Sequence, residues 1–235
     1  MESQSRIVDR SQRNAARVVA VVYPLTFFAV AVAFYRFYLP LIALNDAAAT
    51  ARNLAAHEQT FRLYLTAALA HGVGVVVLLA ALYVVLRPVN QGLALFATLC
   101  RLVYGLMWFV HVLDLFGALR AAGGPANLPA LAVMRLASAQ DAYYVGLGFY
   151  GLGTIVFACL WFKSRYVPRG LAAWGVLSSL FMAICGFAYL LFPGFGAIVS
   201  VNWYELPVAL FELAISVEIL VKGLRPPAVM ETAKV

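Results

Sequence analysis

The sequence predicts an all-α membrane protein, a polytopic bundle of six transmembrane helices with one short external or interfacial helix. Of its 235 residues, 64% are hydrophobic and only 11% are charged, whereas soluble domains are about 45–50% apolar and about 25% charged. Several apolar runs are also long enough to cross a bilayer, which takes about 20 residues in a helix. The mean hydropathy of +0.89 agrees with both observations.

Six apolar runs are the predicted spans. They comprise residues 18–35, 63–86, 93–119, 142–162, 171–192 and 203–221. The first run is too long for a cleaved signal peptide and ends in bulky aromatic residues, so we expect it to be retained. The predicted organisation is therefore a basic cytoplasmic tail (1–17), one transmembrane domain (18–224) and a cytoplasmic C-terminal tail (225–235).

Two segments between the spans are too polar or too short to cross. Residues 46–60 begin with Asp46, a good helix cap, and continue with alanines that favour a helix. We expect this helix to lie at the outer surface, resting on the second and third spans. Residues 128–140 read as a separate short amphipathic piece.

The positive charge indicates a topology rather than a nucleic-acid partner. The formal net charge is +7, but Lys and Arg sit in short segments between apolar runs, and the partner they indicate is the lipid bilayer. Most of them fall in the N-terminal tail, around Arg87, in residues 163–169 and around Lys222. With six spans these segments share one face, which the positive-inside rule assigns to the cytoplasm.

The third span carries ionisable side chains, which are costly inside a bilayer. Arg101, Trp108 and His111 fall on one stripe of this helix, with Asp114 at its edge. Arg101 and Asp114 are about 20 Å apart along the axis and cannot pair. Glu212 in the sixth span lies at the depth of Arg101, so we predict an intramembrane ion pair between them. The alternative, in which Arg101 snorkels to the surface, requires a long reach from mid-membrane.

A second polar group is expected in the outer half of the bundle. Its members are His71, His111, Asp114, Asp141 and Glu205. His111 and Asp114 are three residues apart on one helix, so the carboxylate could hold the imidazole tautomer. We interpret the group as a pocket for a proton or a small polar ligand; the alternative is hydrogen bonding between helices with no ligand.

No familiar catalytic or cofactor signature occurs in the sequence. Patterns such as HExxH, GxSxG, GxGxxG and the Walker loop are missing, and the three cysteines show no CxxC spacing. We therefore predict no metal site and leave catalytic residues and cofactor unassigned. Two function classes stay open: a sensor, accessory subunit or permease that binds a small ligand or proton, and an intramembrane enzyme. The enzyme would act on a lipid or quinone-like substrate with His111 and Asp114 as its acid–base pair.

Four glycines fall within the fourth span, at positions 146, 148, 151 and 153. Small residues on a membrane helix let a neighbouring backbone approach closely. A flexible hinge is the alternative interpretation.

Three stretches resemble the bacterial membrane family known as domain-of-unknown-function family 4386. They run over residues 47–106, 143–180 and 192–220, and include RLVYGL, FPGFG and FELAISVEIL. The positions that look like recurrent ones are Phe61-Arg62, Leu86 to Asn90, Arg101, Pro168-Arg169 and Glu212. The resemblance implies a bacterial inner-membrane protein of uncharacterised activity and no catalytic residues; His111 and Asp114 depart from the common pattern.

Overall fold

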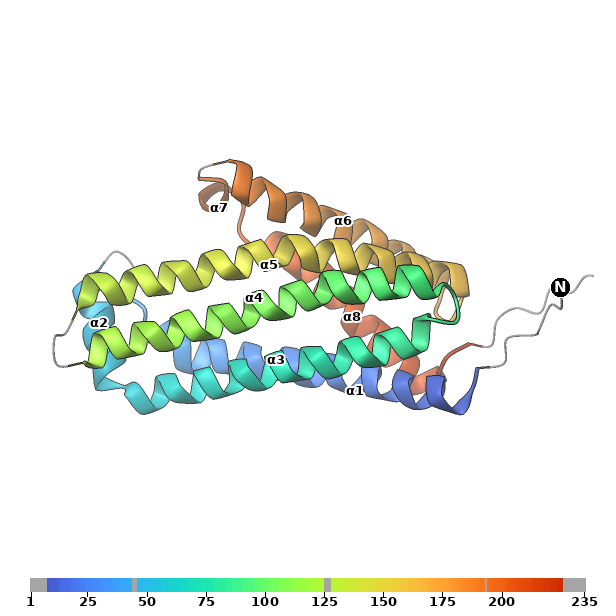
Figure 1. The fold of residues 1–235 in the computed structure, drawn as a ribbon, viewed down its shortest axis with the longest axis horizontal. Helices are drawn as coiled ribbons and strands as arrows, with labels where there is room; N and C mark the ends of the chain where they lie inside the picture. Colours follow the sequence, from blue (N-terminus) through green and yellow to red (C-terminus); the bar gives the residue numbers. More distant parts are fainter. Residues whose placement is uncertain (1–7, 44–45, 125–127, 193, 226–235) are drawn as a thin grey trace, which may run out of the picture.

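The computed structural model describes residues 8–43, 46–124, 128–192 and 194–225, and every regular element among them is helical (Figure 1). In chain order these elements are α1 (Arg10–Ala33), a π-helical turn (Phe34–Tyr38), a 3-10 turn (Leu39–Leu41), α2 (Ala47–Ala56), α3 (Glu58–Leu86), α4 (Gln91–Gly123), α5 (Pro129–Ser164), α6 (Arg169–Leu191), α7 (Phe195–Ile198) and α8 (Asn202–Lys222).

Five segments of the described chain are long and apolar enough to cross a membrane. They are Arg10–Leu41, Glu58–Leu86, Gln91–Gly123, Pro129–Ser164 and Arg169–Leu191. The molecule is therefore a multi-pass helical membrane protein. The predicted sixth span corresponds to α8, which is 21 residues long but carries Glu205, Glu212 and Glu218. These three carboxylates set α8 apart from the five apolar helices.

The longest helix corrects one sequence expectation. Residues 128–140 and the fourth span are not separate pieces, because α5 runs unbroken for 36 residues from Pro129 to Ser164. The polar residues Arg135, Gln140 and Asp141 suggested a break, yet no glycine or proline interrupts the helix between Pro129 and Gly146, and most residues there are good helix formers. The polar positions lie on the first half of a continuous helix beside α4.

Glycines let α5 pack closely on two neighbours. A Cβ atom on Gly153 would lie 2.7 Å from Arg101 Cγ and 2.8 Å from the Ala97 carbonyl oxygen of α4. On another side of α5, a Cβ atom on Gly151 would lie 2.6 Å from the backbone nitrogen of Ala183 in α6. Both contacts require glycine, so these residues serve close helix packing, as predicted from their spacing.

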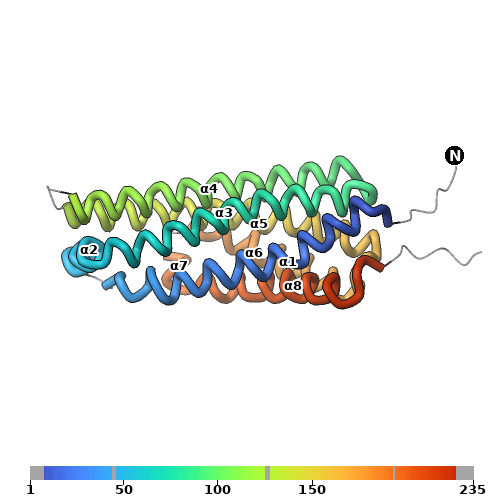
Figure 2. Tube along the Cα trace, turned by 90° about the horizontal axis from the view of Figure 1, so that it is seen from below, coloured from blue at the N-terminus to red at the C-terminus, as the bar shows by residue number. Residues whose placement is uncertain are grey.

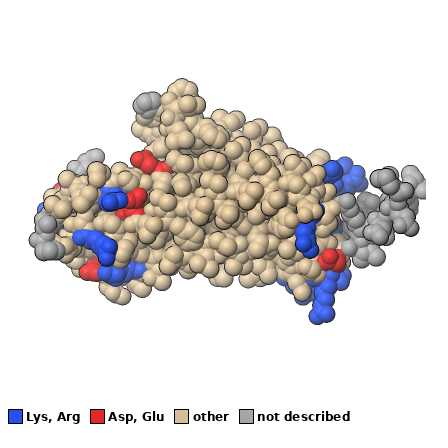
Figure 3. All heavy atoms as spheres, in the orientation of Figure 1, with Lys and Arg blue, Asp and Glu red and all other residues tan. Residues whose placement is uncertain are grey.

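One end of the bundle is basic, and the ends of several helices meet there. Gln12 at the start of α1 donates to the Val85 carbonyl of α3 (3.0 Å) and to the Tyr166 hydroxyl (3.3 Å). The Arg225 backbone nitrogen, just past α8, donates to the Tyr166 carbonyl (3.0 Å). α1 therefore starts where α3, α5 and α8 end, and α1 and α8 lie side by side (Figure 2). On the face drawn in Figure 3, charged side chains gather at the two ends and leave an uncharged belt between them.

Helix α2 is shorter than predicted and rests mainly on α4 and α5, of which only α4 was expected. Asp46 caps it through a hydrogen bond from the Ala49 backbone nitrogen (2.8 Å), and its inner face buries Thr50, Ala51 and Leu54. α2 ends at Ala56, and α3 begins at Glu58 after a bend at His57. The main neighbours of α2 are α4, which is the predicted third span, and α5. It makes little contact with α3, the predicted second span, because α3 continues directly from that bend and leaves the ends of the α4–α5 pair to be covered.

Candidate functional site

A buried polar layer joins α4, α5 and α8 in the middle of the bundle. We call Arg101, Tyr150, Thr154 and Glu212 the inner layer. Arg101 Nη1 donates to Glu212 Oε1 at 2.9 Å and to Thr154 Oγ1 at 2.7 Å. The Tyr150 hydroxyl donates to the same carboxylate, and the Arg101 guanidinium lies over the Tyr150 ring at 3.7 Å. The structure thus brings Arg101 and Glu212 into a salt bridge that an aromatic ring covers.

The inner layer is shielded from the surroundings of the bundle. Arg101 is 1% exposed and Glu212 is 8% exposed. A buried charge of either sign is costly alone, but each here has an opposite charge and further hydrogen bonds. Gly153 lies beside this pair, since the absence of a side chain there makes room for Arg101.

A second layer repeats the inner one, seven residues away on each of the three helices. Trp108 takes the place of Arg101 on α4, Tyr143 that of Tyr150 on α5, and Glu205 that of Glu212 on α8. We call Trp108, Tyr143 and Glu205 the outer layer; seven residues correspond to about 10 Å along a helix. From the inner to the outer layer, residue numbers increase by seven on α4 and decrease by seven on α5 and α8. This is expected, because α4 runs antiparallel to the other two helices.

The outer layer has a Tyr–Glu hydrogen bond like that of the inner layer. The Tyr143 hydroxyl donates to Glu205 Oε1. Trp108 packs its ring 5.8 Å from that of Tyr143, centroid to centroid, and its indole nitrogen donates to the Ala68 carbonyl of α3 at 2.7 Å. That hydrogen bond fixes the indole ring, so Trp108 forms a rigid wall of the layer.

The two layers differ in charge. Glu212 has the guanidinium of Arg101, whereas the described residues contain no salt bridge to Glu205. The aligned position on α4 is the neutral Trp108. Both glutamates accept a tyrosine hydrogen bond, so the cation is the main chemical difference between them.

The two histidines predicted for the site both pack against Trp108, with their rings tilted relative to the indole. The His71 ring centroid lies 4.6 Å from that of Trp108, and His71 Nδ1 is 3.3 Å from the Thr26 carbonyl oxygen. The His111 ring lies 5.1 Å from Trp108 and 6.0 Å from Tyr143. His111 Nδ1 is 2.8 Å from the Ala139 carbonyl oxygen, while its Nε2 is buried without a hydrogen-bond partner.

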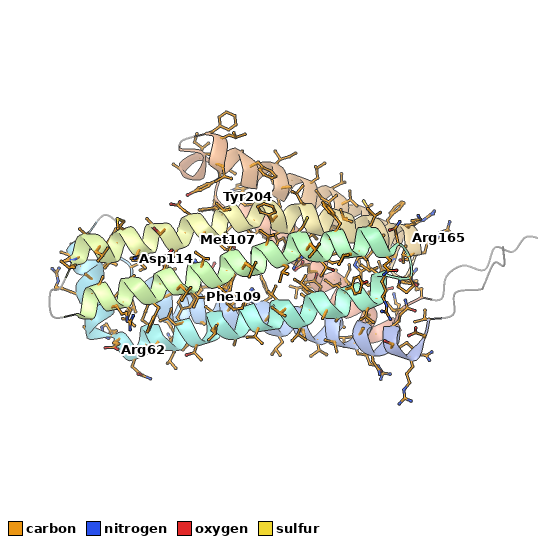
Figure 4. All side chains as sticks on the ribbon, viewed as in Figure 1. Arg62, Met107, Phe109, Asp114, Arg165 and Tyr204 are labelled. Carbon is orange, nitrogen blue, oxygen red and sulfur yellow. The ribbon has the colours of Figure 1, made fainter. Side chains whose placement is uncertain are left out.

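The two aspartates predicted for the same pocket bind elsewhere. Asp114 forms a salt bridge with Arg135 of α5 at 2.8 Å, where the arginine is half exposed. Asp141 accepts a hydrogen bond from the Tyr189 hydroxyl of α6 at 3.1 Å. Figure 4 shows Asp114 closer to the α2 end of the molecule than Tyr204, which directly precedes Glu205. The expected hydrogen bond between Asp114 and the His111 imidazole is therefore not formed. Asp114 binds Arg135 of the facing helix, which offers it a full opposite charge, and the imidazole contacts the Ala139 carbonyl instead.

The sequence did not lead us to Tyr150 and Thr154, whose hydroxyls complete the inner layer. The predicted ion pair rested on charged side chains, and a hydroxyl within an apolar run gives no comparable signal by itself. One signal was available, since Tyr143 and Tyr150 on one helix and Glu205 and Glu212 on another share the same seven-residue spacing. Two helices that repeat the same pair of residue types at one spacing indicate two stacked layers.

The geometry suits hydrogen bonding and proton binding better than metal binding. Among the described residues, no group of three or more His, Cys, Asp or Glu side chains could hold a metal ion. The outer layer instead combines one carboxyl group, one phenol and a neighbouring imidazole within an aromatic wall.

The fold and these layers define a multi-pass membrane protein with a polar interior. The chain belongs to the family described as Domain of unknown function (DUF4386), whose family model matches residues 18–223. No curated protein and no solved structure matches the chain.

Proposed function

We propose that this protein binds protons reversibly at Glu205 and works as a sensor, accessory subunit or permease whose state follows that protonation. The observation that carries the proposal is the contrast between the layers. Glu212 is neutralised by Arg101, whereas Glu205 shares a hydrogen bond with Tyr143 and has no salt bridge within the described residues. Glu205 is half-buried, and a carboxyl group that is partly removed from water and has no cation beside it can be neutralised by binding a proton.

His111 supports the same proposal. Its ring lies 6.0 Å from Tyr143, the partner of Glu205, and its Nε2 is buried without a partner. A neutral imidazole nitrogen of this kind can accept a hydrogen bond from a polar group. The outer layer and His111 therefore place a carboxyl group, a phenol and a hydrogen-bond acceptor close to one another.

The geometry does not favour the alternative of an intramembrane enzyme acting on a lipid or quinone-like substrate. That function would use His111 and Asp114 as an acid–base pair. Asp114 is instead engaged by Arg135 and the imidazole by the Ala139 carbonyl. We therefore place a proton, rather than a substrate undergoing chemistry, at the centre of the function.

We further propose that α8 is a sixth crossing, with both termini cytoplasmic in a bacterial inner membrane. The basic helix ends support this orientation through the positive-inside rule, and the family resemblance supports the bacterial origin. Glu212 lies about 15 Å along α8 from Lys222, near the middle of a hydrocarbon core of about 30 Å, and Glu205 lies about 25 Å along it. Glu205 would then sit near the outer surface, where protons can reach it.

Labelling with a hydrophobic carbodiimide tests this function, because such reagents react with protonated carboxyl groups. We expect the purified protein to be labelled at Glu205, with a rate that falls as the pH rises. Glu212 is the matched control within the same chain, because its carboxylate is bound to Arg101. Peptide mass mapping that finds Glu205 unlabelled, or Glu212 labelled as fast, would overturn the proposal.

A further inference from the structure

A shallow, open apolar groove lies along the outside of α1. It has a volume of about 630 Å³, and its lining includes Val21, Leu25, Phe28 and Val32 of α1 and Leu220 of α8. These side chains are exposed on the surface of the bundle. From Ala20 to Val32 the groove follows α1 for about 18 Å, close to the thickness of one leaflet of the hydrocarbon core.

Two arginines stand at the basic end of this groove. Arg13 and Arg17 precede Val21 and Leu25 at intervals of four residues, so they continue the same stripe of α1. Both are exposed, and neither forms a salt bridge within the described part of the chain. The stripe is therefore cationic for its first two turns and apolar for the next three.

The neighbouring charges on α8 leave this end positive. Lys222 and Arg225 both bind Glu218, at 3.0 and 2.7 Å, so this cluster of two cations and one anion keeps a net positive charge. On α1, the Asp9 carboxylate is occupied as the cap of the helix, accepting from the Gln12 backbone nitrogen at 2.7 Å. The basic end of the groove thus carries Arg13 and Arg17, and the cluster of Lys222, Arg225 and Glu218 on α8 adds one net positive charge.

We propose that this groove binds an anionic phospholipid of the leaflet at the basic end, with an acyl chain along α1 and the phosphate at Arg13 and Arg17. The length of the groove matches one leaflet, and the charge at its mouth is opposite to that of the headgroup. A second transmembrane helix would fill the apolar part but would leave the two arginines without an anion. The proposal is independent of proton binding at Glu205.

Native mass spectrometry of the full-length protein in detergent tests the site with two defined lipids. The probes are phosphatidylglycerol and phosphatidylcholine with identical acyl chains. We expect the wild type to retain phosphatidylglycerol preferentially. Each arginine near an anionic group contributes about a fivefold preference, so Arg13→Gln/Arg17→Gln should lower the preference by about 25-fold.

A matched variant removes two charges at the opposite end of the molecule. Arg52→Gln/Arg120→Gln should keep the preference of the wild type, because these exposed arginines lie far from the groove. Equal retention of the two lipids by the wild type would overturn the proposal. So would the same loss of preference in both double variants, since it would show only a general effect of net charge.

Filling the groove tests the position of the acyl chain separately. Ala29 lines the groove and is exposed, so Ala29→Leu should fold normally and retain several-fold less phosphatidylglycerol. Ala80→Leu on the exposed face of α3 is the control and should bind as the wild type does. Equal retention by the two leucine variants would place the lipid elsewhere. A wild-type dimer that Ala29→Leu dissociates would show that a second copy of the chain occupies the groove, which also overturns the proposal.

Discussion

At the scale of single residues, the salt bridge between Arg101 and Glu212 offsets the free-energy cost of burying two charged side chains inside the bundle. A lone arginine at mid-membrane costs at least about 2.5–3.5 kcal/mol on insertion scales. Here the guanidinium has a carboxylate at 2.9 Å, a hydroxyl at 2.7 Å and an aromatic ring at 3.7 Å. These contacts replace the water that both ions lose, so each ion depends on the other.

Removing one ion should therefore destabilise the protein more than removing both. Arg101→Ala and Glu212→Ala should each lower the free energy of unfolding by about 3–5 kcal/mol, because each leaves an unpaired buried charge. The double variant should recover part of that loss. Thermal unfolding in detergent measures all three variants, and additive losses would show that the two ions do not interact.

An exposed pair in the same chain provides the control for this cycle. Glu58 and Arg62 form an i,i+4 salt bridge with side chains about half exposed. Removing either residue should change the stability by about 0.5 kcal/mol or less, since water screens both charges.

For single residues, the sequence predicts the level of a side chain along its helix axis but not the direction in which that side chain points. Counting residues placed Arg101 and Glu212 at one level, and the structure brings them together. The same counting grouped Asp114 with His111, although Asp114 binds Arg135. Depth does not fix the rotation of a helix or the rotamer of a side chain, and the competing Arg135 lay in a segment expected to be separate from the fourth span.

At the scale of elements, α5 organises the packing because two of its faces lack side chains where neighbours approach. Gly153 faces α4 and Gly151 faces α6. The glycine spacing indicated this close approach from the sequence. The length of α5 was not foreseen, because the polar residues before Tyr143 suggested the end of a span rather than part of a longer helix.

Substitution of Gly153 tests the packing of α5 against α4. Gly153→Ala places a methyl group 2.8 Å from the Ala97 carbonyl oxygen, so the helices must separate, and the protein should lose about 1–3 kcal/mol of stability. Gly170→Ala is the control, since nothing lies within 4 Å of the added atom, and alanine favours a helix over glycine. A thermal unfolding scan in which both variants behave alike would refute close packing at Gly153.

At the scale of the whole molecule, the bundle has a basic end, an uncharged belt and a second end of mixed charge (Figure 3). Composition was sufficient to predict a multi-pass helical membrane protein. It was not sufficient for the number of crossings, since α8 combines the length of a span with three glutamates. Its glutamates face partners that only the folded bundle supplies, including Tyr143, Tyr150 and Arg101.

Reporter fusions test the proposed crossing of α8. Fusions after Gly124 and after Arg225 should report opposite sides of the membrane, with the second one cytoplasmic. A fusion after Ile198, between α6 and α8, should report the same side as the one after Gly124. Finding the Ile198 and Arg225 fusions on one side would show that α8 does not cross.

We propose that the proton binds at Glu205, which has no salt bridge within the described residues, rather than at Glu212 with its Arg101 partner. Infrared difference spectroscopy across a pH titration tests this directly, through the carbonyl stretch of a protonated carboxyl group. We expect a titrating band in the wild type and in Asp141→Asn, and its loss in Glu205→Gln. A band that persists unchanged in Glu205→Gln would show that the proton binds to another group.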